Sequence, residues 1–333
     1  MPAAHHIAAP AVCEAASKGR TRMDQQLASK GQIEDPASFL HPSESAEAIL
    51  AHRRFPAART AYIAGIMSLY ENNPFLSRLI CEAGRSVVFF VILCLHAGSD
   101  DDDPETWLTI GLLRRTVATY GITSQRRIDE LIGRLVETRY LAIRTPSSDR
   151  RLRILAPTER MLAHDRDWLA VHYRPLDILH PDPGYGPALD GDPAFQRAHR
   201  RISIQMSAYA TSLMAQNQVA MMFLIREAGI PILMKLIQGL EGREGEAWQP
   251  VSFTDLGDRF GVSRTHVRNL LRDVAEMGLA AISGHEILLR PPLLAAHDRF
   301  VADGMVGHIL TFRMAMESLG RAFGMRRQAL PLA

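Results

Sequence analysis

The sequence predicts a mainly α fold with small β wings, built as an internal duplication whose two halves sit in a pseudo-twofold arrangement. Three observations predict this class: short motifs recur in the same order, apolar residues recur at helical spacing, and each half ends in two short extended segments around a turn. The 333 residues are 47% hydrophobic and 22% charged, which excludes wholesale disorder and a collagen-like chain. A chain of this length has room for about two domains.

Two sequence motifs occur twice. Leu-Ile-x-Glu-Ala-Gly occupies residues 79–84 and 224–229, and Ala-His-Asp-Arg occupies residues 163–166 and 296–299. Between the motifs, four apolar residues at helical spacing recur 139 residues later: Ile128, Leu131, Ile132 and Leu135, then Val267, Leu270, Leu271 and Val274. The separation falls from 145 residues at the first motif to 133 at the second, as expected when loops change length. We therefore expect two repeats, over residues 57–181 and 200–306.

The remaining segments have different expected roles. Residues 1–43 show no sustained hydrophobic period and are expected to form a mobile tail, followed by a docked helix over residues 44–56. Residues 182–199 are rich in proline and glycine, which predicts an irregular linker. Residues 307–333 are expected to form an amphipathic helix that either packs on the repeats or mediates self-association.

Each repeat opens with helices that are apolar nearly all round, over residues 61–70 and 75–97 and over residues 202–216 and 219–239, which is typical of buried or interface helices. A short extended stretch follows, over residues 107–110 and 248–251. A helix then turns at Gly121 and a second helix starts at Ser124; Gly261 and Ser263 occupy the same places in the second repeat. Serine can cap a new helix and glycine permits the tight turn, so this pattern predicts a helix-turn-helix.

Two strands around a turn complete each repeat, over residues 140–143 and 151–155 and over residues 280–282 and 287–289. A helix-turn-helix followed by a two-stranded hairpin is a winged helix. The second helix of such a unit stands clear of the domain and can enter the major groove of DNA.

Polar side chains on these second helices and wings are the candidate DNA contacts. In the first repeat they are Ser124, Gln125, Arg126, Arg127, Glu130, Arg134, Arg150 and Arg151. In the second repeat they are Arg264, Thr265, His266, Arg268, Asn269, Arg272 and His285. Arginine pairs bidentately with guanine and asparagine with adenine, so Arg126, Arg127 and Asn269 are the leading base contacts.

Charge is concentrated in the first repeat. The whole chain has a net charge of +2, yet residues 124–153 hold eight arginines against four carboxylates. Local clustering of this kind is what a DNA surface needs, although a solvated helix face is the alternative. We expect the first repeat to supply more electrostatic affinity and the second more hydrogen-bond selectivity.

Residues 149–160, Asp-Arg-Arg-Leu-Arg-Ile-Leu-Ala-Pro-Thr-Glu-Arg, resemble the wing and following helix start of the multiple antibiotic resistance regulator (MarR) family. The resemblance covers residues 85–170 well and residues 230–303 more weakly. It implies a DNA-binding transcription regulator whose flanking helices form a dimer. It also raises a small-molecule effector bound in the apolar space between flanking helices, where five methionines lie: Met67, Met206, Met214, Met221 and Met222.

Members of that family normally carry one winged helix per chain, so the expected assembly is a monomeric pseudo-dimer or a homodimer. Two recognition helices in one chain would lie about 34 Å apart, one turn of DNA. Their different side chains predict an asymmetric DNA site.

The sequence disfavours several other classes. It has no phosphate-binding loop, metal motif or nucleophile signature, so we expect no enzyme activity, cofactor or metal; duplication explains the recurring His-Asp pairs at 164–165 and 297–298. Cys13, Cys81 and Cys94 form no CxxC pair and are expected to be reduced thiols. No apolar run is long enough for a membrane helix and no signal peptide is evident, so we expect a cytoplasmic protein without a membrane partner.

Two alternatives to a transcription regulator stay open. Tandem winged helices also occur in plasmid-type replication initiators, which would recognise repeated origin sites. A winged-helix adaptor for protein contacts would have less basic recognition faces, which suits the second repeat better than the first.

Overall fold

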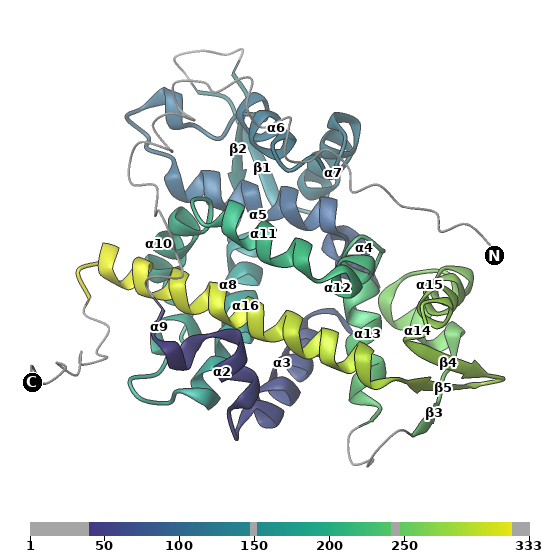
Figure 1. The fold of residues 1–333 in the computed structure, drawn as a ribbon. Coiled ribbons are helices and arrows are strands. Elements are labelled where there is room, and N and C mark those ends of the chain that lie inside the picture. The colour runs from purple at the N-terminus through teal and green to yellow at the C-terminus, as the bar shows by residue number, and fades with distance from the viewer. Residues whose placement is uncertain (1–39, 147–151, 241–246, 322–333) are drawn as a thin grey trace, which may run out of the picture.

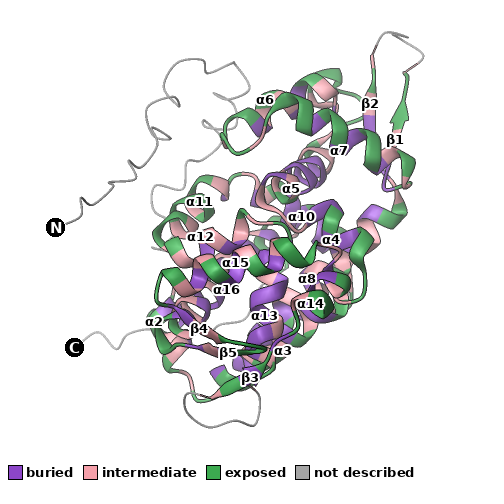
Figure 2. Cartoon of the chain, turned by 90° about the vertical axis from the view of Figure 1, so that its right-hand side faces the viewer, coloured by how far each residue is buried: buried purple, intermediate pink, exposed green. Residues whose placement is uncertain are grey.

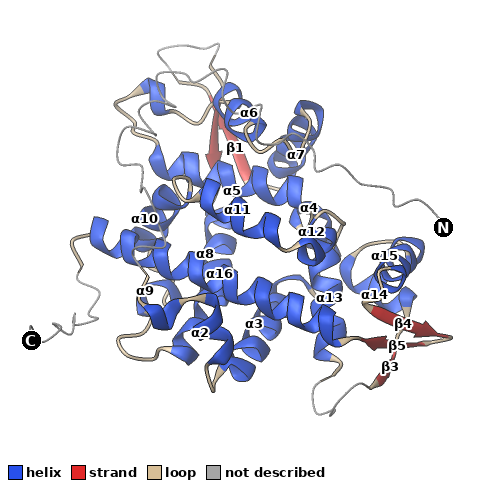
Figure 3. Cartoon of the chain, viewed as in Figure 1, coloured by secondary structure: helices blue, strands red, loops and turns tan. Residues whose placement is uncertain are grey.

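The computed structural model describes residues 40–146, 152–240 and 247–321 (Figure 1). It confirms a mainly helical fold with small antiparallel sheets, which lie in two separate places in Figure 3. Apart from residues 40–43, the expected mobile tail lies outside the described residues.

The first unit runs from the start of α2 to the end of α8, after the short 3-10 helix η3 (Pro42–Glu44). Its elements are α2 (Ala46–Ala51), α3 (Phe55–Tyr70), α4 (Pro74–Ile80), α5 (Ala83–Gly98), η4 (Pro104–Thr106), α6 (Ile110–Ala118), α7 (Gln125–Glu137), β1 (Leu141–Arg144), β2 (Ile154–Pro157) and α8 (Glu159–Leu179). We call α6, α7, β1 and β2 the first module.

The second unit runs from α9 to α16. Its elements are α9 (Gly186–Leu189), α10 (Pro193–Ser203), α11 (Ser207–Gln216), α12 (Gln218–Leu224), α13 (Gly229–Gln238), β3 (Trp248–Pro250), α14 (Phe253–Phe260), α15 (Arg264–Glu276), β4 (Ala280–Ser283), β5 (Glu286–Leu289) and α16 (Pro291–Ser318). We call β3, α14, α15, β4 and β5 the second module. The described helices outside both modules, with the turns that join them, form the helical frame.

The two modules share one order of elements. In the first, β1 and β2 form an antiparallel pair with Leu141 opposite Pro157, and Thr109 adds an isolated bridge to Ile154. In the second, β3 takes the place of that bridge and the sheet order is β3-β5-β4. Each module therefore has an extended segment, two helices joined by a tight turn, and a hairpin that leads into a long helix, α8 or α16.

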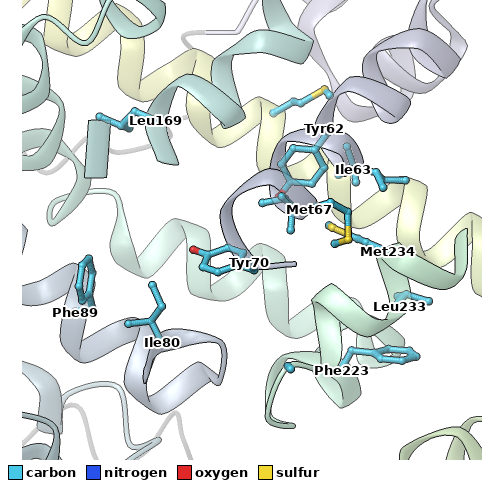
Figure 4. Packing of buried hydrophobic residues seen from close by; sticks show 14 of the residues in the cluster. Tyr62, Ile63, Met67, Tyr70, Ile80, Phe89, Leu169, Phe223, Leu233 and Met234 are labelled. Carbon is cyan, nitrogen blue, oxygen red and sulfur yellow. The ribbon is translucent and has the colours of Figure 1, made fainter. Parts of the chain in front are cut away.

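A single hydrophobic core runs through both units. Figure 4 shows Tyr62, Ile63 and Met67 of α3 beside Leu233 and Met234 of α13. The packing is reciprocal: α3 of the first unit packs on α13 of the second, and α10 of the second packs on α5 of the first. Likewise α2 packs on α16, the long helix that crosses Figure 1, and α9 packs on α8. The units are joined by burial of apolar surface on both, which is the main favourable term in association.

Three helices expected from the sequence differ in the structure. The helix expected over residues 202–216 begins only at Ser207, as α11, and none of its residues is buried. The other two are each broken. The expected helix over residues 75–97 ends at Ile80 and restarts at Ala83, because the Glu82 carboxylate caps the backbone N–H groups of Gly84 and Arg85, at 3.1 Å each. The expected helix over residues 219–239 breaks between Leu224 and Gly229, where Ala228 has a φ of 52°. Both breaks fall in the recurring Leu-Ile-x-Glu-Ala-Gly motif.

Three expected boundaries were also wrong. The helix expected over residues 44–56 ends at Ala51, and α3 begins at Phe55. The irregular linker expected over residues 182–199 contains α9 and most of α10, whose first turn is capped by the Asp192 carboxylate. The boundary expected at residue 306 falls inside α16, which continues to Ser318 because its apolar side chains stay buried along the frame. Residues 322–333 of the expected C-terminal helix lie outside the described residues.

Within the described ranges, no single helix is both long and apolar enough to span a membrane. Only α4 and α5 taken together pass on length and composition, and they are bent by 83° relative to each other.

Candidate nucleic-acid interface

Helix α7 presents a polar face to solvent. The Ser124 hydroxyl accepts a hydrogen bond from the Arg127 backbone N–H at 3.4 Å, so the helix begins where the sequence predicts. Its four predicted core residues, Ile128, Leu131, Ile132 and Leu135, are buried. Its predicted DNA-contacting residues are all exposed: Ser124, Gln125, Arg126, Arg127, Glu130 and Arg134.

The charges of α7 are divided between two faces. Arg126 Nε lies 3.4 Å from Glu130 Oε1, and the side chains are 86% and 59% exposed, so this pair costs little to separate. Asp129 instead accepts two hydrogen bonds from Arg114 of α6, at 3.0 and 2.6 Å. The bidentate pair joins α6 to α7 and offsets a carboxylate that would otherwise repel phosphate. The outward face therefore keeps its arginines available.

The hairpin of the first module adds further arginines. Arg144 at the end of β1 is exposed, and Arg153 Nη1 donates to Thr145 Oγ1 at 3.2 Å across the hairpin. The predicted phosphate contacts at the tip, Arg150 and Arg151, lie outside the described residues.

Helix α15 has the same local design but a different environment. The Ser263 hydroxyl accepts from the His266 backbone N–H at 3.0 Å, and Val267, Leu270, Leu271 and Val274 are buried as predicted. Four predicted contacts on α15 are exposed and two are half-buried: Arg264, Thr265, Arg268 and Arg272, then His266 and Asn269. The second wing's predicted contact, His285, is exposed, and its carbonyl accepts from the Val251 N–H at 2.7 Å.

The frame holds α15 at two points. The His266 ring Nε2 lies 2.9 Å from the Glu227 carbonyl oxygen, and Arg226 forms a 2.6 Å ion pair with Asp273. His266 is therefore partly committed to the frame, which the sequence did not predict.

The two recurring Leu-Ile-x-Glu-Ala-Gly motifs contact each other. The Ala228 N–H donates to the Cys81 carbonyl at 2.7 Å, and Arg85 Nη2 lies 2.6 Å from Glu227 Oε1. Sequence reasoning missed Arg85 and Glu227 as joining residues, although the glutamate shared by both motifs was a signal. Figure 2 looks onto the side of the molecule on which both α7 and α15 lie.

The recurring His-Asp pairs lie in the frame, not in either module. Asp165 of α8 and Arg200 of α10 form a buried ion pair at 2.5 Å, and Asp298 of α16 pairs with Arg59 of α3 at 2.9 Å. Each pair joins one unit to the other. Both recurring aspartates therefore form ion pairs between the two units.

Two cavities lie beside the frame. One, of about 440 Å³, is lined mainly by polar side chains of α5, α8 and α10, and the other, of about 500 Å³, lies between the start of α12 and α16. None of the five methionines expected near an effector lines either cavity, and Met67 and Met206 are buried in the core. The effector remains a prediction without a located site.

Comparisons with known proteins find no match: not to a protein-family model, not to a curated protein and not to a solved structure. Inferences about function therefore depend on the geometry of the chain itself.

Proposed function

We propose that the chain is a sequence-specific double-stranded DNA-binding transcription regulator with two winged-helix units resembling those of the MarR family. The observation that carries the proposal is the set of exposed arginines on α7, a helix that lies on the same side of the molecule as α15. Arginine on the first turns of a helix held clear of its domain is suited to base edges and phosphates in the major groove. Such a regulator would act in the cytoplasm.

The contacts of the frame support an internal duplication that makes one chain resemble a dimer. The packing of α3 on α13 is matched by that of α10 on α5, as a twofold relation requires. The ion pairs Asp298–Arg59 and Asp165–Arg200 are matched in the same way, because each links the Ala-His-Asp-Arg motif of one unit to an early helix of the other. A pseudo-dimer would present two unlike recognition helices to an asymmetric site.

An adaptor role is the competing function, and one observation favours it. His266 and Asp273 of α15 already contact residues 226–227 of the frame, so the second module uses part of its helix for protein contacts. A regulator and an adaptor differ in whether α7 selects DNA sequences.

The test is selection of bound duplexes from a random DNA pool by the purified chain at about 50 and about 200 mM salt. Wild-type protein should enrich a motif of two unlike halves about ten base pairs apart. The variant Arg126→Ala/Arg127→Ala should lose one half of the motif. Arg53→Ala/Arg174→Ala, which removes two exposed arginines from the α2–α3 turn and from α8, is the charge-matched control and should keep both halves. No enriched motif at either salt concentration would overturn the proposal in favour of the adaptor.

A further inference from the structure

The turn glycines of the two modules have the same backbone conformation but different surroundings. Gly121 and Gly261 have φ values of 64° and 72°. A Cβ atom added to Gly121 would meet nothing within 4 Å, whereas one added to Gly261 would lie 2.7 Å from the Pro74 carbonyl oxygen and 2.9 Å from Arg78 Cδ. The second module therefore packs the backbone of its turn glycine against α4 of the first unit, while the turn glycine of the first module has open space around it.

A cluster of charged groups lies beside this contact. Glu71, at the end of α3, has its Oε1 atom 2.6 Å from Arg259 Nη1 of α14 and 2.8 Å from Lys235 Nζ of α13. The next residue, Asn72, donates its backbone N–H to the Arg259 carbonyl at 3.1 Å. We call Glu71, Lys235 and Arg259 the Glu71 cluster. It joins the α3–α4 turn of the first unit to two helices of the second.

The Glu71 carboxylate is 15% exposed and stays charged at neutral pH. Burial raises its pKa, but the hydrogen bonds from Lys235 and Arg259 outweigh burial and bring the pKa below its usual value. A partly buried carboxylate that accepts hydrogen bonds from two cationic donors contributes more to stability than an exposed ion pair does.

Among the described residues the first module has no equivalent charged cluster, although Tyr120, next to Gly121, forms a hydrogen bond with Ser207 of α11 in the second unit. Arg259 stands two residues before Gly261, whereas Thr119 stands two residues before Gly121. Glu71 lies two residues before Asn73, which caps α4. In the second unit Asn217 caps α12, and the two residues before it, Ala215 and Gln216, carry no charge. The Glu71 cluster therefore acts on the second module only.

We propose that Glu71 is a positioning residue that fixes the second module against the first unit and thereby sets the spacing between the DNA half-sites bound by α15 and α7. This inference rests on the proposed function. The first module packs mainly on α5 and α8 of its own unit, with Tyr120 in contact with Ser207 of the other, but the second packs on α13 of its unit and α4 of the other. The orientation of α15 relative to α7 consequently depends on a contact between units, and the Glu71 cluster is the charged part of that contact.

The isosteric variant Glu71→Gln tests the positioning directly in the free, full-length chain. Loss of the charge should speed hydrogen exchange of the α14 and α15 amides by about tenfold and leave those of α6 and α7 unchanged. Lys235→Gln, which keeps the Arg259 partner, should have a smaller effect on the same amides. Glu47→Gln removes an exposed ion pair with Arg299 at 2.8 Å on the frame and is the control. Equal exchange in Glu71→Gln and the control would overturn the positioning role.

The effect on DNA is tested with duplexes that carry the two selected half-sites separated by the preferred spacer or by one base pair more or less. Wild-type protein should lose about tenfold in affinity at each altered spacer, because the second module cannot follow the displaced half-site. Glu71→Gln should bind the three spacers within about threefold of one another. Retained discrimination in that variant would overturn the proposal. If wild-type protein selects no DNA, the proposed function fails and the spacing role fails with it, while the exchange measurement still judges the Glu71 contact separately.

Discussion

The first and second modules share an element order, a turn glycine and a serine-capped second helix, yet they contact the rest of the chain differently. Helix α7 of the first module offers exposed arginines, and its Asp129 is neutralised within the module by Arg114. Helix α15 of the second module is tied to the frame through His266 and Asp273. Local sequence similarity therefore gives the two modules the same order of elements, whereas contacts outside a module decide how much of its second helix stays exposed.

The largest expected difference between the modules is at their turn glycines. Gly261→Ala should lower the free energy of unfolding by about 3 kcal/mol, because a strained positive φ adds to a Cβ contact with the Pro74 backbone. Gly121→Ala should cost only about 1 kcal/mol, because its Cβ would occupy open space. Urea denaturation of the variants measures both values.

Gly278→Ala supplies the matched control inside the second module. Gly278 has the same φ as Gly261, 72°, and a Cβ added there would meet nothing within 4 Å. Its substitution should cost as little as that of Gly121. A similar loss of stability in Gly261→Ala and Gly278→Ala would show that the contact with α4 contributes nothing.

The elements of each module were predictable because their signals are local. The spacing of Ile128, Leu131, Ile132 and Leu135 defines the buried face of α7, and Ser124 marks its start, all within a dozen residues. Helix α10 was not predicted, although its signal was also local. Asp192 followed by Pro193 is typical of a helix start, but the neighbouring glycines and prolines favoured the prediction of an irregular linker.

The contacts between units could not be predicted in the same way. Glu71 and Arg259 are 188 residues apart, and the sequence around either residue does not identify the other as its partner. The break between α4 and α5 also escaped detection, because the apolar period continues across Cys81 while the Glu82 side chain caps a new helix. The exposed and buried faces of α7 were assigned correctly, but His266 and Asn269 of α15 are half-buried, and the position of His266 depends on where the frame places Glu227.

The next largest expected difference between the modules is the contribution of each wing to DNA affinity. Removal of Arg150 and Arg151, which lie outside the described residues, should weaken binding to every duplex about thirtyfold at about 0.15 M salt, through the loss of two phosphate contacts. The slope of log affinity against log salt should fall in magnitude by about 2. His285→Ala in the second wing should change affinity by less than about twofold, because residues 280–289 hold no lysine or arginine whose loss would remove a phosphate contact. Salt titrations of binding distinguish the two, and equal slopes in all three proteins would place the wings away from DNA.

The proposed base contacts, Arg126 and Asn269, should act on different halves of the proposed DNA site. Arg126→Ala should relax sequence preference in one half-site by about tenfold, because it removes a bidentate guanine contact. Asn269→Ala should relax the other half-site by a similar or smaller factor, because Asn269 is half-buried. Selection from random duplexes gives both preferences, and a change in the same half-site for both variants would contradict the assignment of one module to each half.

Acid should produce the smallest difference between the modules, because it should act on both of them together. Three histidines, His172, His199 and His308, lie where α8, α10 and α16 meet, with the His172 and His308 rings 4.9 Å apart. Burial lowers the pKa of all three, and that of His172 falls to about 3. Because the folded pKa lies below the unfolded value of about 6.5, stability is complete above pH 6.5 and declines as the pH falls below it.

At pH 5.5 the free energy of unfolding should be lower than at pH 7 by about 1 kcal/mol for each of these three histidines, and His172→Gln should remove its own share of this difference whatever its effect at pH 7. Carboxylates such as Glu71 lose their charge only at lower pH, so they do not contribute in this window. Hydrogen exchange at pH 5.5, corrected for the intrinsic rate, should then increase in both modules, since the three histidines lie between frame helices of both units. An increase confined to the second module would instead assign the acid sensitivity to the contact between α14 and α4.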